Sequence, residues 1–207
     1  TAIKGWVITL NDDATDKDTL KMGFDIIEKE TDRLTIMVEE LLDFSKLVSG
    51  IVQLSKRSVD IISFVTHIDN YMKPRALNEG INFTVDISEN VYKGFFDYNK
   101  MKQVLINILD NAFKFTDKEG KVILLVDQNE DCVKFTIIDT GIGISSEELP
   151  RVKEKFYKGK NSNSKNGIGL SICDEIIKLH KGTFNIESEL GKGTSVKITI
   201  PNIKEEK

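Results

Sequence analysis

A heptad repeat near the start of the chain limits the fold more than any other feature. Apolar or small residues recur at alternating spacings of four and three, at Leu20, Phe24, Ile27, Thr31, Leu34, Val38, Leu41, Ser45 and Val48. This pattern predicts one long helix with a continuous apolar seam, and such a seam needs a partner helix. The first ten residues predict a short helix before it. We therefore expect a helical hairpin over residues 1–50 that forms half of a dimeric four-helix bundle, and a monomeric hairpin packed on the rest of the chain is the alternative.

The composition is that of an ordinary folded protein with one substantial core. The chain has 207 residues, 40% of them hydrophobic, and a formal net charge of -4 with no basic stripe, which argues against nucleic-acid binding. No apolar run is long enough to cross a bilayer, so we expect no membrane contact by this part of the protein. Cys132 and Cys173 form no CxxC pair, which indicates reduced thiols. We expect a cytoplasmic location, and an inner-membrane anchor elsewhere in the complete protein stays open.

A second domain is predicted over residues 58–203, after Ser49-Gly50 ends the long helix. Helical patterns cover residues 60–78, 103–116 and 168–179, and Pro74 predicts a break or kink in the first of them. Strand patterns cover 81–88, 92–97, 121–128, 132–139, 184–188 and 195–200. This order predicts an α+β fold, an α/β sandwich in which one mixed sheet is covered by helices on one face.

The helix predicted at residues 103–116 has two chemically distinct faces. Its apolar face consists of Val104, Leu105, Ile108, Leu109 and Ala112. Its other face carries Gln103, Asn107, Asn111 and Lys114, where a solvated helix would normally carry charged residues. Carboxamide oxygens suit Mg²⁺, and an ammonium group suits phosphates, so this face favours a phosphate-bearing ligand.

Three glycine-rich stretches follow this helix. In DTGIGI, Asp139 ends an apolar strand, where its carboxylate suits an exocyclic amine such as that of adenine. KNGIGL opens a helix, whose backbone N–H groups favour an anion, and GKGT is a tight turn between strands. The basic stretch RVKEKFYKGKNSNSK lies between the first two and has the composition of a lid over phosphates.

The order NxxxNAxKF, DTGIGI, KFYKG, NGIGLSI and GKGT resembles the nucleotide-binding boxes of the sensor histidine kinase ATP-binding domain. That domain is part of the larger ATPase group that includes gyrase, Hsp90 and MutL. The resemblance runs from about Ser58 to Pro201, and the preceding hairpin, ending in FSKLVSG, resembles the dimerisation and histidine-phosphotransfer domain of that family. It implies an ATP-dependent protein-histidine kinase of a two-component system, with ATP and Mg²⁺ as cofactors.

On this resemblance, one group of residues surrounds the base. Asp139 accepts a hydrogen bond from the adenine amino group, Phe115 lies near the base, and the pocket is shaped by Gly141, Gly143 and Thr194.

A second group surrounds the metal and the phosphates. Asn111 ligates Mg²⁺, Asn107 and Lys114 lie beside the phosphates, and Lys158 is the cation of the lid. The hinge and the phosphate-facing start of the last helix are formed by Gly167, Gly169 and Leu170.

The resemblance also implies partners and an acceptor. Family members carry the phosphoacceptor histidine immediately before a stretch like TAIKG, so it is expected upstream of Thr1, and these residues alone are not expected to autophosphorylate. The pattern favours structural roles for His67, as a buried helix residue, and for His180, as a cationic helix cap. A homodimer through residues 1–50 and the receiver domain of a response regulator are the expected partners. The alternatives are a non-catalytic dimerisation and signalling module with a vestigial site, and a serine kinase of the anti-sigma type.

Overall fold

The chain forms two compact units, Thr1–Lys46 and Leu47–Lys207, in a computed structural model. The residues that the structure describes are 2–11, 16–48, 53–155, 157, 159 and 167–202. Lys158 and the Ser49-Gly50 helix stop lie outside these residues. The domain limits 1–50 and 58–203 remain predictions.

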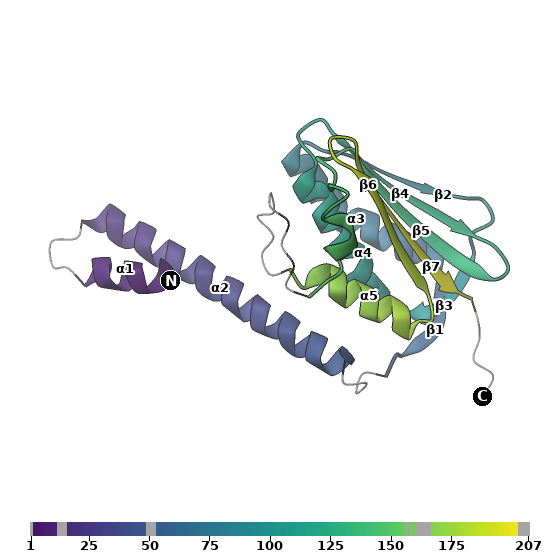
Figure 1. Ribbon diagram of the computed structural model, residues 1–207, viewed down its shortest axis with the longest axis horizontal. Coiled ribbons are helices and arrows are strands. Elements are labelled where there is room, and N and C mark those ends of the chain that lie inside the picture. The colour runs from purple at the N-terminus through teal and green to yellow at the C-terminus, as the bar shows by residue number, and fades with distance from the viewer. Residues whose placement is uncertain are drawn as a thin grey trace. The chain divides into compact units, whose positions relative to one another are not determined.

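The first unit is a helical hairpin, as the heptad pattern predicts. Helix α1 (Ala2–Leu10) lies beside α2 (Lys17–Val48) in Figure 1. The carboxylate of Asp16 accepts hydrogen bonds from the backbone N–H groups of Asp18 (3.0 Å) and Thr19 (2.9 Å), which caps the start of α2. Gly23 lets the two helices approach, because a Cβ atom there would lie 2.8 Å from the Trp6 side chain.

Much of the predicted seam is uncovered within one chain. Phe24, Leu34, Val38 and Leu41 retain 61%, 46%, 55% and 43% of their accessible surface. The short helix α1 therefore cannot cover the length of α2, and the apolar stripe requires another surface.

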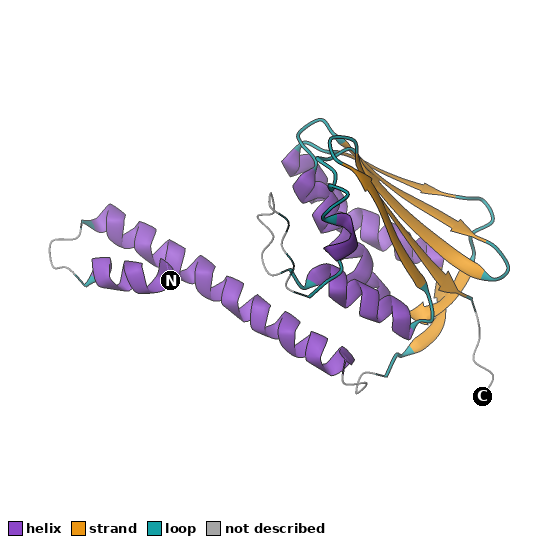
Figure 2. Cartoon of the chain, in the orientation of Figure 1, coloured by secondary structure: helices purple, strands orange, loops and turns teal. Residues whose placement is uncertain are grey.

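The second unit has an α+β fold, with helices over one face of a mixed sheet (Figure 2). Its five strands are arranged in the order β2-β4-β5-β7-β6. They are β2 (Asn82–Ile87), β4 (Lys121–Gln128), β5 (Cys132–Asp139), β6 (Thr183–Glu189) and β7 (Gly193–Pro201). Strand β2 is parallel to β4, and all other pairs are antiparallel.

A second, two-stranded sheet corrects the expectation of one mixed sheet. Strand β1 (Lys56–Asp60) pairs antiparallel with β3 (Lys93–Asp97). The sequence pattern missed β1, because only Val59 of its five residues is buried and no apolar alternation marks it.

Three helices pack on the larger sheet: α3 (Ile61–Glu79) contacts β2, α4 (Tyr98–Phe115) contacts β5, and α5 (Gly169–Leu179) contacts β6. The core between these layers includes Phe64, Phe96 and Phe135, whose ring centroids lie 5.3 to 6.3 Å apart. Pro74 does not break α3, which continues to Glu79 and ends at Gly80 in a left-handed conformation. Among the described residues, no helix combines the length and the apolar content needed to cross a bilayer.

Candidate functional site

Asp139 is held at the end of β5 in a buried position. Its side chain is 8% exposed, and its Oδ1 accepts hydrogen bonds from the backbone N–H groups of Gly141 (2.9 Å) and Thr194 (3.1 Å). Burial raises the pKa of this carboxyl, while the two hydrogen bonds act in the opposite direction. Both bonds end at Oδ1, so within the described part of the chain Oδ2 is the oxygen left for a ligand.

Backbone segments come unusually close together around Asp139. A Cβ atom on Gly141 would lie 2.3 Å from the carbonyl oxygen of Phe115, and one on Gly143 would lie 2.0 Å from that of Glu189. The structure thus brings together Asp139, Phe115, Gly141, Gly143 and Thr194, which were predicted to surround one pocket. A side chain at either glycine would collide with this backbone, so the two glycines permit the close approach of these segments.

Ser188 connects two of the glycine-rich turns, and the sequence patterns did not reveal it. Its Oγ donates to the carbonyl oxygen of Gly193 (2.8 Å), accepts from the N–H of Ile144 (2.8 Å) and lies 2.9 Å from the Oγ1 of Thr194. Ser188 is opposite Thr194 in the pairing of β6 with β7. Its only sequence signal is its place at the end of a strand next to the GKGT turn.

Helix α4 has the two faces that its sequence predicts. The five apolar residues named above are buried, whereas Asn107, Asn111 and Phe115 are half-buried and Lys114 is exposed. The ammonium of Lys114 lies 5.1 Å from the centre of the Phe115 ring. Asp110 forms an ion pair with Arg75 of α3, which directs this carboxylate toward the neighbouring helix.

Asn107 lies against the start of α5. A Cβ atom on Gly169 would lie 2.7 Å from both the Nδ2 and the Oδ1 of Asn107, so glycine permits this contact. The Cys173 thiol of α5 donates to the carbonyl oxygen of Val104 in α4 at 3.8 Å, and burial raises the pKa of this thiol to about 12. Asn107 therefore joins the two helices that were predicted to face the phosphates, and the buried thiol is unreactive.

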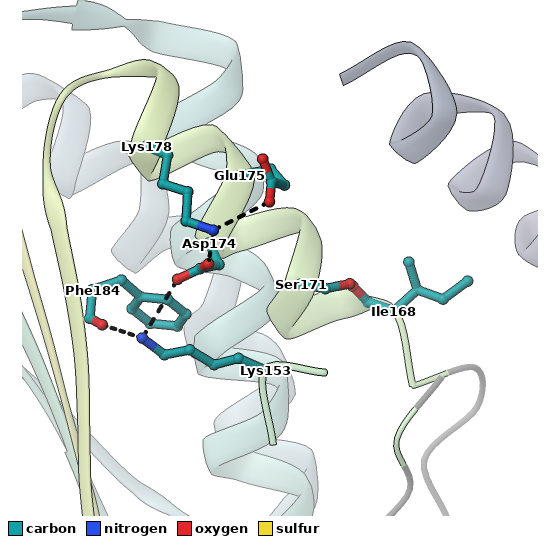
Figure 3. A network of polar contacts seen from close by, with 7 residues as sticks. All are labelled: Lys153, Ile168, Ser171, Asp174, Glu175, Lys178 and Phe184. Atoms are coloured by element: carbon teal, nitrogen blue, oxygen red, sulfur yellow. Dashed lines mark hydrogen bonds and ion pairs between the residues drawn. The ribbon is translucent and has the colours of Figure 1, made fainter. Parts of the chain in front are cut away.

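The start of α5 presents backbone N–H groups without a side-chain cap. Its N-cap residue, Ile168, forms no side-chain hydrogen bond to them, and the Ser171 Oγ donates to the Ile168 carbonyl oxygen at 2.7 Å (Figure 3). Gly167, with a φ of 68°, precedes this turn, and Gly169 and Leu170 are its first helical residues. The arrangement suits an anion at this helix end.

Lys153 fixes the chain that leaves the short 3-10 helix η1 (Leu149–Arg151). Figure 3 shows its ammonium directed toward Asp174 of α5 and Phe184 of β6. The Nζ atom donates to the Phe184 carbonyl oxygen, lies 3.4 Å from the Asp174 Oδ1 and lies 4.4 Å from the centre of the Phe184 ring. The beginning of the predicted lid stretch is therefore attached to α5 and to the sheet.

The two histidines differ from their expected environments. His67 is exposed instead of buried, because the buried stripe of α3 passes through Phe64 and Ile68. Its Nε2 lies 2.9 Å from the Lys102 Nζ. His180 is buried, with 3% exposure, and its Nε2 accepts from the N–H of Asp97 at 3.0 Å. A ring nitrogen that accepts a hydrogen bond carries no proton, so His180 is a neutral cap and the expected cation is wrong.

Residues 96–204 match the family model described as histidine kinase-, DNA gyrase B-, and HSP90-like ATPase. The chain is 32% identical over 209 residues to the sensor histidine kinase YclK of Bacillus subtilis, an alignment that covers 97% of this chain and 43% of the relative. It is also 32% identical over 192 residues to the sensor protein SrrB of Staphylococcus aureus, covering 90% of this chain and 33% of the relative. The chain thus spans less than half the length of these curated relatives.

Solved structures share the fold. Full-length ShkA, in complex with AMPPNP, superposes with a TM-score of 0.78 at 26% identity and covers 97% of this chain and 42% of that one. ThkA, in complex with the response regulator protein TrrA, superposes with a TM-score of 0.79 at 23% identity and covers 99% of this chain and 58% of that one. In both cases nearly the whole chain is matched, including the helical hairpin.

Proposed function

The chain belongs to the family of histidine kinase-, DNA gyrase B- and HSP90-like ATPases and carries a sensor histidine kinase catalytic domain, and we propose that it binds Mg-ATP for transfer of the γ-phosphate to a histidine. In the complete protein the phosphate then passes to an aspartate in the receiver domain of a response regulator. We propose that this domain lies in the cytoplasm.

The observation that carries this proposal is the fixed carboxylate of Asp139. Its Oδ1 is occupied by two backbone N–H groups, and Oδ2 is the acceptor for the adenine amino group. The close approach of the Phe115 carbonyl to Gly141 holds the end of α4 beside the loop that follows Asp139, and we assign Phe115 to the edge of the base. The similar protein ShkA was crystallised in complex with AMPPNP, which supports a nucleotide as the ligand.

The phosphates and their metal are assigned to the facing ends of α4 and α5. Asn111 is the protein ligand for Mg²⁺, Asn107 and Lys114 lie beside the phosphates, and Lys158 is the lid cation. On the α5 side the phosphates are assigned to Gly167, Gly169 and Leu170. Mg²⁺ would neutralise phosphate charge, while the residues of the chain position the nucleotide.

The acceptor of the phosphate is a histidine outside residues 1–207. The sequence has two histidines. His180 is buried and holds two backbone groups, and His67 is on α3 within the nucleotide-binding unit. The nucleotide domain supplies positioning and charge neutralisation. Residues 1–207 should bind ADP in calorimetric titration and remain unlabelled by γ-labelled ATP, and strong self-labelling would contradict this assignment.

Replacing Asn111 with Ala should remove the effect of Mg²⁺ on nucleotide binding. We expect ADP affinity in Mg²⁺ to fall about tenfold or more, equivalent to about 1.4 kcal/mol, because the metal loses its protein ligand. Affinity without Mg²⁺ should change little. Calorimetric titration with and without Mg²⁺ measures both values. Asn99→Ala is the matched control, since Asn99 is exposed in the first turn of the same helix, and an unchanged response to Mg²⁺ in Asn111→Ala would reject the assignment.

We also propose that the hairpin forms a homodimer through its exposed seam. Leu34→Asp should weaken dimerisation by at least about 100-fold, since each of two equivalent leucines loses roughly 1.5–3 kcal/mol of burial. Sedimentation equilibrium of the variant should show monomers at concentrations where the unmodified chain is dimeric. Lys29→Gln changes the net charge by the same amount away from the seam and should leave the dimer intact. A monomeric unmodified chain would favour a hairpin that packs within one chain.

A further inference from the structure

Two segments of the second unit meet at the buried side chain of Asp97. Its Oδ1 accepts from the backbone N–H groups of Asn99 and Lys100, both at 3.0 Å, and so caps the first turn of α4. Its Oδ2 accepts from the N–H of Ser55 at 2.8 Å, just before β1 begins. The Asp97 carboxylate thus joins the start of α4, the helix that carries residues assigned to the nucleotide, to the segment that enters β1.

His180 adds the end of α5 to this junction. Its Nε2 accepts from the N–H of Asp97 at 3.0 Å, and its Nδ1 lies 2.8 Å from the carbonyl oxygen of Ile176. A nitrogen beside a carbonyl must carry the proton, and a nitrogen facing an N–H group must offer its lone pair. The two partners therefore select the neutral ring with its proton on Nδ1, and a second proton on Nε2 would face the N–H of Asp97 directly.

The contact between His180 and Asp97 joins the end of α5 to the start of α4. On both helices, the residues assigned to the nucleotide lie toward the other end. Gly169 begins α5 and His180 caps its other end, about 17 Å away at 1.5 Å per residue. The helices touch near the site where Gly169 packs on Asn107, and they are joined again through the ring of His180 and the N–H of Asp97. Two contacts at opposite ends fix the position of α5 along α4.

We propose that His180 is a positioning residue for the nucleotide site: its neutral ring holds α5 against the start of α4, and protonation of the ring releases this contact and weakens nucleotide binding. The inference rests on the proposed nucleotide site. It makes nucleotide binding sensitive to acid through a residue that lies far from the nucleotide. The segment around Ser55 belongs to the same junction, because the Ser55 N–H binds the Asp97 carboxylate.

The surroundings of the ring favour its neutral form. Burial lowers the pKa of His180 below its usual 6.5, and the nearby Lys56 of β1 acts in the same direction. The Ile176 carbonyl and the Asp97 carboxylate act in the opposite direction, and Lys181 follows His180 in the chain. Because the folded-state pKa lies below the unfolded value, the stabilisation is complete above pH 6.5 and is lost as the pH falls through the folded-state pKa.

Two amide variants separate the hydrogen bonds of the ring. The Oε1 of Gln takes the place of Nε2, so His180→Gln keeps the acceptor for Asp97. The Nδ2 of Asn takes the place of Nδ1, so His180→Asn keeps the donor to Ile176 and loses the contact with Asp97. Neither amide titrates, and Asp139 and the phosphates of ADP titrate equally in all three proteins, so differences between them report on His180 alone.

The test is calorimetric titration with ADP between pH 5.5 and 8, together with thermal unfolding. At pH 8, His180→Gln should bind like the unmodified chain, whereas His180→Asn should bind roughly threefold to tenfold more weakly, the effect of one lost hydrogen bond. On acidification, the unmodified chain should lose more affinity than His180→Gln and approach His180→Asn. Nitrogen-15 shifts should show the proton of His180 on Nδ1 at pH 8.

The outcomes separate this inference from the proposed function. Variants with lower melting temperatures but with the ADP affinity and pH profile of the unmodified chain would overturn the inference and leave the nucleotide site standing. Absence of ADP binding by the unmodified chain at every pH would reject the proposed function, and the inference with it.

Discussion

Replacing Asp139 with Asn is expected to abolish measurable nucleotide binding while the domain remains folded. The amide oxygen can still accept from the N–H groups of Gly141 and Thr194, so the local backbone keeps both hydrogen bonds. The amide nitrogen then occupies the place of Oδ2 and presents a donor to the adenine amino group, which is also a donor. A lost hydrogen bond to a charged acceptor costs about 1.5–3 kcal/mol, or roughly 10- to 150-fold in affinity, and the opposed donors add to this.

The same substitution is expected to raise stability at neutral pH. Burial holds the pKa of the Asp139 carboxyl above its usual 3.8, so the folded state binds this proton more tightly than the unfolded state does. Stability from this group is therefore complete below pH 3.8 and declines as the pH rises through the folded-state pKa. The amide in Asp139→Asn does not ionise, so thermal unfolding at pH 7 should show a melting temperature equal to or above that of the unmodified chain.

Asp86→Asn is the control for both measurements, because Asp86 is exposed on β2 and its substitution should affect neither ADP affinity nor melting temperature. Calorimetric titration with ADP measures the first effect. Unchanged ADP affinity in Asp139→Asn would remove the carboxylate from the base pocket. A strong loss of stability would instead mean that the carboxylate serves the fold.

Local periodicity in the sequence predicted the elements that carry the site. The apolar spacing in α4 placed Val104, Leu105 and Ile108 in the core, and the strand patterns at 121–128 and 132–139 match β4 and β5. Helix and strand periods are properties of neighbouring residues, so a single sequence displays them. The resemblance to the nucleotide-binding boxes of the kinase family then predicted which segments would meet.

Contacts between distant segments could not be predicted in the same way. The N–H of Thr194 reaches Asp139 across 55 residues, and Ser188 and Asp97 act through hydrogen bonds to backbone that no side-chain pattern marks. His67 shows the limit of periodicity, because a residue beside a buried stripe can face solvent. Patterns of neighbouring residues therefore predicted helices and strands, and the structure adds the backbone contacts between distant segments.

The GKGT turn allows two nearly identical substitutions with different expected results. Gly191 and Gly193 both have positive φ angles, 81° and 110°. A Cβ atom on Gly191 would have no heavy atom within 4 Å, whereas one on Gly193 would lie 2.0 Å from the carbonyl oxygen of Asp139. Gly191→Ala therefore tests backbone strain alone, and Gly193→Ala adds a collision with the backbone that carries Asp139.

Gly193→Ala should lower the free energy of unfolding by roughly 3 kcal/mol or more, since strain and a steric overlap with backbone occur together. Gly191→Ala should cost only about 1 kcal/mol, the usual penalty for a left-handed alanine. Because β5 and β7 must separate to admit the methyl group, the bond from the Thr194 N–H to Asp139 weakens, and ADP affinity should fall only in Gly193→Ala. Denaturant unfolding and calorimetric titration measure the two effects. Equal behaviour of the two variants would mean that the turn can move away from β5 without cost, and the close approach at Gly193 would then have no part in shaping the base pocket.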